Sequence, residues 1–405
     1  MSGPSVVVFS AGGGHFQRLL PLVAGLVRRG AAVHVMTRPE AREPAEAAGA
    51  RFFDLFGKYP VEAADDRSIP LPSRLVSFAA VYAEPLIAEV LALRPALIVY
   101  DSFVVVAPLI ARQLGIPYVG MRAGHAQVPE RAIAETRADP RVAISAACLA
   151  AVERLRTLYG MQDASPFSYL GGLSPYLNLC AEPPRFLGED ERAVFEPVAF
   201  FGSLAPERRE AESTQRPLAG EGADLRVYVS FGTVIWRYYA PQALAAIARL
   251  AEALHKRGAR ALISLGHYPA SPAERRPLEL PGVRALRYVD QWGALRDADC
   301  FVTHHGLNST HEAIYHRVPM LSYPFFGDQP EMATTCQRLG LAVALADAPR
   351  AELAPARVQR AIDTVLDQRE AFAARLEQAR GWELEVIARR EQVLDRVLAL
   401  ARPPG

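Results

Sequence analysis

Two short stretches of the chain combine histidine with glycine and polar side chains. The first, AGGGHFQR, places His15 after three glycines, and Asp101 follows the distant apolar run ALIVY. A carboxylate hydrogen-bonded to one imidazole nitrogen leaves the other free to take a proton from a hydroxyl. The two residues therefore form a candidate general base. An ordinary alternative stays open for each, since His15 could begin a helix and Asp101 could be the N-cap of another.

The second stretch, THHGLNSTHEA (303–313), follows the apolar run that predicts a strand. Ser309 and Glu312 fit an S-x-x-E capping box at the start of a helix, which by itself would be only structural. His304 and Asn308 lie beside that predicted helix start. Backbone N–H groups and the helix dipole at such a place suit a diphosphate. Together with the histidine and carboxylate pair, this anion site predicts group transfer from an activated diphosphate donor.

The first glycine turn is a poor match to a dinucleotide-binding fingerprint. Gly12 and Gly14 fit the first two positions of G-x-G-x-x-G, but Gln17 occupies the third. The next apolar run ends in VMTRPE, without an acidic residue for a ribose. NAD is therefore not expected as a cofactor.

Strands and helices alternate in both halves of the chain, which predicts an α/β protein with parallel sheets. SVVVFS and PALIVYDS are typical buried strands, and RVYVSFGT restarts the pattern after a segment rich in Pro, Gly and charge. We predict two Rossmann-like domains that face each other across a cleft. The expected boundaries are an N-terminal domain at 1–205, a linker at 206–225, a second domain at 226–380 and a C-terminal helix at 381–405 that packs back toward the first domain.

The composition of the 405-residue chain narrows the class of protein further. Hydrophobic residues make up 50% and charged residues 22%, which is ordinary for a chain with a full core. A formal net charge of +1 provides no field that would attract nucleic acid. The four scattered cysteines show no metal-binding spacing, and neither a signal peptide nor an apolar run of about 18 residues is visible. We expect a cytoplasmic monomer or weak homodimer without integral membrane association.

The sequence also resembles a known family. YVDQWGALRDADCFVTHHGLNSTHEAIYHRVPMLSYPFFGDQ (288–329) is similar to the donor-binding signature of family-1 glycosyltransferases, the UDP-glycosyltransferase superfamily. GGGHFQRLLPLVAGLVRRG and VYDSF resemble N-terminal motifs of the same family. The likeness is greatest to bacterial macrolide and natural-product enzymes, including those of antibiotic biosynthesis. It implies the GT-B fold and transfer of a sugar from a nucleotide diphosphate to a small molecule.

The resemblance also implies a role for individual residues. His15 would be the general base and Asp101 its orienting carboxylate. His304 and the turn after it would bind the diphosphate, Glu312 the ribose, Tyr288 the base, and neighbouring residues the phosphates and the sugar. The implied donor-binding residues are Gly14, Thr233, Tyr288, Val289, Gln291, His304, Gly306, Asn308, Ser309, Glu312, Asp328 and Gln329.

Several positions depart from the family pattern and leave the nucleobase and acceptor open. Tyr288 replaces a frequent tryptophan, His305 stands where glycine or cysteine is common, and Leu307 replaces a frequent tryptophan or methionine. Asp297 and Asp299 match the D-x-D of metal-dependent enzymes only superficially, so no metal is expected. Retaining relatives often carry a second glutamate eight residues after the first, and the residue eight after Glu312 is Met320, which favours inversion.

We therefore expect an inverting, metal-independent enzyme that moves a hexose, with UDP-glucose as the favoured donor, to a small hydrophobic acceptor. The acceptor is expected to contact Phe56 to Phe78 and Met121 to Cys180. Transfer of a deoxysugar from a dTDP donor, or transfer to a lipid, remains an alternative. A nucleotide-sugar epimerase and a non-catalytic nucleotide-sugar-binding protein are the rivals from other classes.

Overall fold

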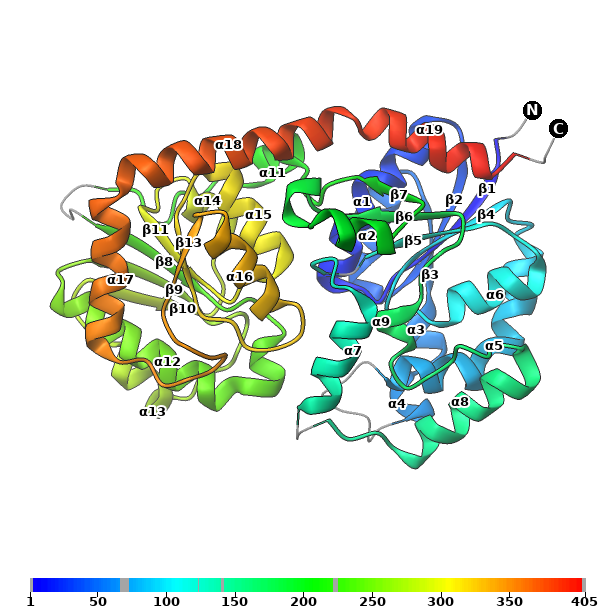
Figure 1. The fold of residues 1–405 in the computed structure, drawn as a ribbon, viewed down its shortest axis with the longest axis horizontal. Coiled ribbons are helices and arrows are strands. Elements are labelled where there is room, and N and C mark those ends of the chain that lie inside the picture. The colour runs from blue at the N-terminus through cyan, green and yellow to red at the C-terminus, as the bar shows by residue number, and fades with distance from the viewer. Residues whose placement is uncertain (1–2, 66–72, 123, 140–141, 221–224, 403–405) are drawn as a thin grey trace. The chain divides into compact units, whose positions relative to one another are not determined.

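The computed structural model describes residues 3–65, 73–122, 124–139, 142–220 and 225–402. Parts of the predicted acceptor loops, residues 66–72, 123 and 140–141, lie outside the described residues. The chain divides into two compact units. Unit 1 comprises Met1–Ser203 and Val386–Gly405, and unit 2 comprises Leu204–Glu385. Both units are α/β domains built on a parallel sheet, as the alternating pattern predicts (Figure 1).

The sheet of unit 1 has seven strands among the described residues, in the order β3-β2-β1-β4-β5-β6-β7. All of its strand pairs are parallel. The strands are β1 (Ser5–Phe9), β2 (Ala32–Thr37), β3 (Arg51–Asp54), β4 (Leu97–Asp101), β5 (Tyr118–Met121), β6 (Leu177–Cys180) and β7 (Val198–Phe200). Because β1 and β4 are neighbours, the residues that follow them meet at one edge of the sheet.

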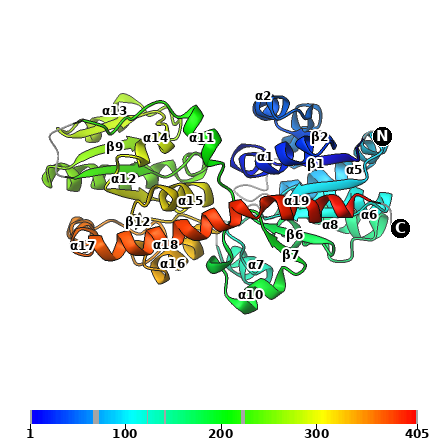
Figure 2. The ribbon, with the colours of Figure 1, turned by 90° about the horizontal axis from the view of Figure 1, so that it is seen from above.

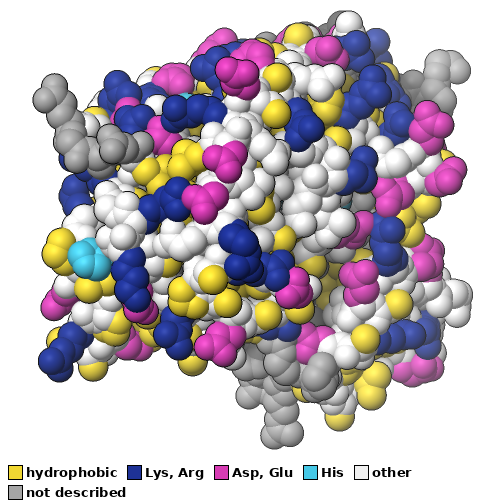
Figure 3. Space-filling view, turned by 60° about the vertical axis from the view of Figure 1, so that its left-hand side comes forward, with side chains coloured by type: hydrophobic (Ala, Val, Ile, Leu, Met, Phe, Trp, Pro, Cys, Tyr) yellow, Lys and Arg dark blue, Asp and Glu magenta, His cyan; other side chains and the backbone are white. Residues whose placement is uncertain are grey.

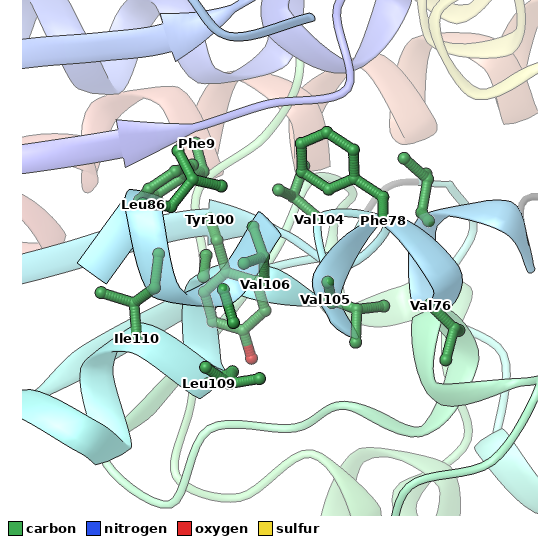
Figure 4. Close-up of a cluster of buried hydrophobic side chains, with 14 of the residues drawn as sticks. Phe9, Val76, Phe78, Leu86, Tyr100, Val104, Val105, Val106, Leu109 and Ile110 are labelled. Atoms are coloured by element: carbon green, nitrogen blue, oxygen red, sulfur yellow. The ribbon is translucent and has the colours of Figure 1, made fainter. Parts of the chain in front are cut away.

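Helices cover both faces of this sheet. They are α1 (Gly13–Arg28), α2 (Arg42–Ala47), α3 (Leu55–Lys58), α4 (Val61–Ala64), α5 (Arg74–Ala92), α6 (Val106–Leu114), α7 (Pro129–Ala138), α8 (Ala146–Tyr159), α9 (Ser168–Gly171), α10 (Glu189–Val194) and α19 (Arg390–Leu400). Side chains of β1 and β4, such as Phe9 and Tyr100, form a buried cluster with α5 and α6 (Figure 4). The strands that carry the predicted base are thus held by the main core of unit 1.

The sheet of unit 2 has six parallel strands in the described part of the chain, in the order β10-β9-β8-β11-β12-β13. The strands are β8 (Arg226–Ser230), β9 (Arg260–Ser264), β10 (Val283–Leu286), β11 (Cys300–Thr303), β12 (Met320–Ser322) and β13 (Ala342–Ala344). Its helices are α11 (Pro206–Glu212), α12 (Ile235–Lys256), α13 (Pro272–Arg275), α14 (Gln291–Leu295), α15 (Leu307–His316), α16 (Gln329–Arg338), α17 (Pro355–Asp367) and α18 (Arg369–Ala388), whose last residues belong to unit 1. The short 3-10 turns are η1 (Pro39–Ala41) and η2 (Pro184–Phe186) in unit 1 and η3 (Arg276–Leu278) in unit 2.

The predicted linker at 206–225 is not simply an exposed connection. It begins with α11, and Ser213 and Leu218 are buried in unit 2. At the other end of the chain, α19 belongs to unit 1 and packs against α1 (Figures 1 and 2). Arg390 donates hydrogen bonds to the carbonyl oxygens of Phe201 and Gly202 at 2.7 and 3.1 Å, which fixes the start of α19 to unit 1.

One helix of the described residues, α5, is long and apolar enough to cross a membrane by length and composition alone. Half of its apolar window is buried inside the protein, and α5 packs against α6 and α8. A buried core helix passes the same test, so this property is weak support for membrane insertion. Basic and acidic side chains are interspersed over the face in Figure 3, in agreement with the near-neutral formal charge.

Candidate functional site

One group of predicted site residues lies at the carboxyl ends of β1 and β4 in unit 1. After Phe9 the chain turns through Gly12 and Gly13, whose φ angles of 89° and 54° are left-handed values that favour glycine. A β-carbon added at Gly12 would also lie 2.7 Å from the side chain of Arg38. This turn starts α1 at Gly13 and places His15 in the first helical turn. Gly14 is exposed beside it.

The carboxylate of Asp101 lies beside this turn because Phe9 and Tyr100 are register partners. Its Oδ1 is 3.3 Å from Nδ1 of His15 and accepts a 2.9 Å hydrogen bond from the Phe103 amide. Its Oδ2 accepts a 2.6 Å hydrogen bond from the Ala11 amide. Burial acts to raise the pKa of Asp101, but His15 and the hydrogen bonds outweigh it and hold the pKa below its usual value. Asp101 is thus a buried, ionised partner for the imidazole.

The imidazole of His15 is oriented but not sealed from solvent. Its side chain is 23% exposed, compared with 1% for Asp101. The ring packs at a centroid distance of 4.6 Å from Phe103. When Asp101 accepts from Nδ1–H, the lone pair is on Nε2, which can take a proton from a hydroxyl. The structure therefore brings together the two residues predicted to form the base.

A second group of predicted site residues lies at the carboxyl end of β11 in unit 2. The ring of His304 is confined between two glycines. A β-carbon added at Gly232 would lie 2.8 Å from its Cε1 and Nε2, and one at Gly306 would lie 2.5 Å from Nε2. Burial lowers the pKa of His304 to about 4, although the backbone at Ser230 acts in the opposite direction. At neutral pH His304 therefore offers a hydrogen bond and no positive charge.

The adjacent His305 has a different environment. Its φ of 61° is a left-handed value that glycine adopts more easily. Its Nε2 is 2.8 Å from the hydroxyl of Ser322, and Nδ1 is 3.3 Å from that of Thr310. Burial, and secondly the neighbouring His304, lower the pKa of His305 to about 3. His305 is thus a neutral core residue that links β11, β12 and α15.

The predicted capping box at Ser309 and Glu312 is wrong. The N-cap of α15 is Gly306, three residues before Ser309, and no side chain of the described residues caps this helix. Both side chains instead contact Gln291, the first residue of α14. Nε2 of Gln291 donates to Glu312 at 2.8 Å and to Ser309 at 3.2 Å. The N-cap residue therefore makes no side-chain hydrogen bond to the first amides of α15, and backbone N–H groups at such a helix start suit an anion. Asn308, in the first turn of this helix, is half-buried.

The residues predicted to contact the nucleobase and the phosphates lie at the carboxyl ends of β10 and β8, respectively. Tyr288 is 56% exposed and stacks on His267, with ring centroids 4.3 Å apart and an interplanar angle of 15°. Val289 is buried, so only its backbone could meet a base. Thr233 is exposed in the loop between β8 and α12. An exposed aromatic face next to polar backbone suits a nucleobase.

The predicted sugar-binding pair is only partly available for that task. Oε1 of Gln329 accepts hydrogen bonds from the amides of Phe325 and Phe326 at 3.0 and 3.3 Å. Gln329 therefore holds its own loop with its oxygen, and its amide nitrogen is the group that can reach a ligand. Asp328 is partly exposed at the N-cap of α16, but its side chain does not cap that helix.

Comparison with known proteins decides the family of the second unit. Residues 194–374 match the family model described as UDP-glucoronosyl and UDP-glucosyl transferase. This part of the chain is a UDP-glycosyltransferase domain. The match agrees with the family expected from the donor signature, and it contains every predicted donor-binding residue except Gly14.

Curated relatives of the UDP-glycosyltransferase domain match over short regions. UDP-glucuronosyltransferase 3A1 of Mus musculus is 40% identical over 67 residues, which is 16% of this chain and 13% of that protein. The ecdysteroid UDP-glucosyltransferase of Orgyia pseudotsugata multicapsid polyhedrosis virus is 37% identical over 101 residues, or 24% of this chain and 20% of that protein. These alignments therefore span at most a fifth of either relative.

Solved structures match the fold over nearly the whole chain. The glycotransferase of kitacinnamycin has a TM-score of 0.78 and 23% identity, and the match covers 98% of this chain and 99% of that one. The calicheamicin glycosyltransferase CalG4 has a TM-score of 0.74 and 22% identity, with both chains fully covered. The spinosyn rhamnosyltransferase SpnG with thymidine diphosphate has a TM-score of 0.62 and 21% identity over 96% and 99% of the chains. The predicted GT-B fold is thus confirmed.

Both carboxylates of the D-x-D sequence in the UDP-glycosyltransferase domain are engaged by arginines. Asp297 pairs with Arg216. Asp299 lies 3.1 Å from Arg226 and accepts its backbone N–H at 2.8 Å. Among the described residues, no group of three or more His, Cys, Asp or Glu side chains is arranged to hold a metal ion. These ion pairs give Asp297 and Asp299 a structural role at the start of β8 and β11.

Sequence reasoning missed the contribution of the segment after Pro206 to the same domain. Glu210 accepts a hydrogen bond from the indole N–H of Trp292 at 3.0 Å and pairs with Arg296. Ser213 donates to Asp290, and its carbonyl accepts from Arg296 at 2.8 Å. The run PERREAE is helical and charged, but it carries no signal of what it would contact. The result is that α11 and the residues after it pack onto α14, next to Gln291.

The histidine at 311 was also given no role by sequence reasoning, although it belongs to the THHGLNSTHEA stretch. It is fully buried on α15, and its Nδ1 is hydrogen-bonded to the buried carboxylate of Glu383 on α18. A comparable buried pair, His125 and Glu182, lies in unit 1 at a distance of 2.8 Å. Both pairs join elements far apart in the sequence, so no local pattern predicts them.

Proposed function

We propose that the protein is an inverting glycosyltransferase that needs no metal and moves a hexose from a nucleotide diphosphate sugar to a small, largely hydrophobic acceptor. The observation that carries this proposal is the contact between His15 and the ionised Asp101 in a chain whose second unit is a UDP-glycosyltransferase domain. A base of this kind is what a hydroxyl acceptor requires to become a nucleophile.

In the proposed reaction the acceptor oxygen attacks the anomeric carbon of the donor sugar. The new oxygen–carbon bond forms while the bond from that carbon to the diphosphate oxygen breaks. The acceptor proton passes to Nε2 of His15, and Asp101 stabilises the resulting imidazolium. One direct displacement inverts the anomeric configuration.

The leaving diphosphate is expected to be stabilised by unit 2. The uncapped N-terminus of α15 offers backbone N–H groups, and His304 adds a neutral hydrogen-bond donor beside it. Electrostatic stabilisation by such preorganised donors can replace a metal ion at a departing anion. This is the physical basis on which we propose that no cofactor is required.

For the donor we propose UDP-glucose. Glu312 and Gln291 form a polar pair suited to ribose hydroxyls, and Asp328 with the amide nitrogen of Gln329 is suited to sugar hydroxyls. A dTDP-deoxysugar is the second candidate. It is supported by the similar fold of a spinosyn rhamnosyltransferase solved with thymidine diphosphate, and by the engagement of the Gln329 oxygen within its own loop.

The test is a panel of hydroxylated aromatic and macrocyclic acceptors incubated with UDP-glucose or dTDP-sugars, with products identified by mass spectrometry. A glycosylated product with inverted configuration supports the proposal. Conversion of the donor to an epimer without acceptor would favour an epimerase. Tight donor binding without product from any acceptor would favour a non-catalytic binding protein, and products confined to lipid acceptors would favour a lipid glycosyltransferase.

A further inference from the structure

Arg209 on α11 is surrounded by carboxylates of the UDP-glycosyltransferase domain. Its Nη2 lies 3.6 Å from Oε1 of Glu312 and 4.0 Å from Oδ1 of Asp290. The guanidinium carbon is 5.7 Å from the centre of the Trp292 ring, and Nη1 lies 3.6 Å from Glu212. The side chain is 26% exposed. An arginine from the predicted linker thus lies beside the glutamate expected to contact ribose.

The two oxygens of Glu312 have separate partners. Oε2 accepts the 2.8 Å hydrogen bond from Gln291, while Oε1 faces Arg209. The side chain is only 12% exposed. Burial raises the pKa of Glu312, and Arg209 is the strongest of the groups that act against this. A buried carboxylate that must accept hydrogen bonds needs such a cation to stay ionised.

Other charged or titratable groups around Glu312 are fewer and weaker. Arg208 on α11 also favours the ionised form, whereas Asp290 opposes it. The phenols of the buried Tyr228 on β8 and of the exposed Tyr288 also interact with Glu312, and both are neutral groups whose own pKa values are raised, mainly by desolvation. None of these can take the place of Arg209, since it is the cation that lies against Oε1.

Arg209 is held in place by the surroundings of α11. The next residue, Glu210, is fixed to Trp292 and Arg296, and further along the segment Arg216 is paired with the buried Asp297. The backbone of α11 therefore cannot move away from α14 without breaking these contacts, which are partly buried. This makes the distance between Arg209 and Glu312 a property of the fold and not of one flexible side chain.

We propose that Arg209 is a positioning residue for the nucleotide: it holds Glu312 as an oriented acceptor for both ribose hydroxyls, and so makes the site prefer a ribonucleotide over a 2′-deoxyribonucleotide. The proposal rests on the donor site assigned above. A ribose can donate two hydrogen bonds to the carboxylate, whereas a 2′-deoxyribose can donate only one. Loss of the cation should therefore weaken UDP binding more than dTDP binding.

The experiment measures binding of UDP and of dTDP to the full chain by calorimetry, without acceptor or turnover. In Arg209→Gln we expect the UDP dissociation constant to rise about 10-fold at pH 7.5, as the loss of one hydrogen bond between a ribose hydroxyl and the Glu312 carboxylate implies. The dissociation constant of dTDP should rise about threefold or less. Arg209→Lys should recover part of the UDP affinity. Arg216→Gln is the matched control, because it removes a cation that docks the same segment but does not contact Glu312.

The pH dependence supplies a second readout. The ionised carboxylate of Glu312 accepts hydrogen bonds from hydroxyls more strongly than the protonated acid, so UDP affinity should weaken as pH falls through the pKa of Glu312. Without Arg209 this pKa is higher, and the loss should begin at a higher pH than in the wild type. A purely structural role for Arg209 would lower affinity without moving the profile.

The outcomes separate the inference from the proposed function. Three results would overturn the role of Arg209 while leaving the donor site intact. They are an equal loss of affinity for UDP and dTDP in Arg209→Gln, an unshifted pH profile of UDP affinity, or the same UDP-selective loss of affinity in Arg216→Gln. Failure of the wild-type chain to bind either nucleotide would overturn the donor assignment itself, and this inference with it. UDP-selective weakening confined to the Arg209 variants would support it.

Discussion

Replacing His15 by alanine tests the proposed base most directly. The change removes the imidazole that faces Asp101 and packs on Phe103, but the carboxylate keeps its hydrogen bonds from Ala11 and Phe103. The turn should therefore keep its shape. Positioned general bases typically contribute about 10²–10⁴-fold to the rate, and we expect kcat to fall by that factor. Donor affinity should survive, because the predicted donor contacts other than Gly14 belong to unit 2.

Asp101→Asn should have a smaller effect on the rate, for a reason visible in the hydrogen bonds. The carboxylate accepts at Oδ1 from Phe103 and faces His15, and accepts at Oδ2 from Ala11. An amide has only one acceptor oxygen, so one side must present an NH2 group. If it faces Ala11, a buried donor is left unpaired at a cost of about 1–3 kcal/mol in stability. If it faces His15, it also meets the Phe103 N–H and forces the ring proton onto Nε2, so the first orientation is expected, and it leaves Nε2 able to act as a base.

The assay is single-turnover formation of product with a hydroxyl acceptor, followed by mass spectrometry, with donor affinity measured separately by calorimetry. His255→Ala is a matched control, since His255 is a partly exposed helical histidine whose Nδ1 lies 2.8 Å from the carbonyl oxygen of Pro281. Near-wild-type turnover of His15→Ala would refute the assignment of the base. A loss of turnover in the control equal to that of His15→Ala would show that the assay reports stability instead.

Three further outcomes are expected from other parts of the site. Activity should persist in excess EDTA, and His304→Ala should bind the donor more weakly than the wild type. If EDTA inactivates the enzyme and manganese or magnesium restores its activity, Asp297 and Asp299 would be metal ligands. When the two donors compete for one acceptor, transfer from UDP-glucose should exceed transfer from a dTDP-2,6-dideoxyhexose, and Asp328→Ala should reduce this difference. Preferential transfer of the dideoxyhexose that is unaffected by Asp328→Ala would contradict this. Because the pKa of His305 is lowered to about 3, its neutral ring stabilises the fold above its unfolded pKa of about 6.5, and this contribution is lost as pH falls. Between pH 7 and 5 the free energy of unfolding, measured with denaturant, should therefore decrease by about 2 kcal/mol more in the wild type than in His305→Gln, and parallel curves would be inconsistent with this.

The sequence predicted that His15 and Asp101 lie close together because this geometry follows from strand order. Apolar runs ending at Phe9 and Tyr100 predicted buried parallel strands, and the residues after such strands share one edge of a sheet. That is enough to bring His15 near Asp101. Strand order could not predict the two backbone N–H groups that donate to the Asp101 carboxylate, because their positions depend on the shape of the turns.

The S-x-x-E motif in unit 2 is an example of an ambiguous sequence pattern. S-x-x-E describes an N-cap with its third residue, but it also describes two side chains on one face inside a helix. In α15 the helix begins earlier, at Leu307, so Ser309 and Glu312 face Gln291 instead of the backbone. The family signature still predicts Ser309 and Glu312 as donor-binding residues, since it does not depend on where the helix starts.

The linker prediction rests on composition, which describes exposure and not partners. PERREAE has the charge density of a solvated helix, and several of its charges do form local pairs such as Arg208 with Glu212. The position of α11 is decided by its contacts with residues of α14 about 80 positions further along the chain, such as those of Glu210 with Trp292 and Arg296. A segment outside the recognised signature thus contributes Arg209 to the surroundings of Glu312. If that contact sets nucleotide preference, substitutions in α11 can change the donor while every residue of the signature stays the same.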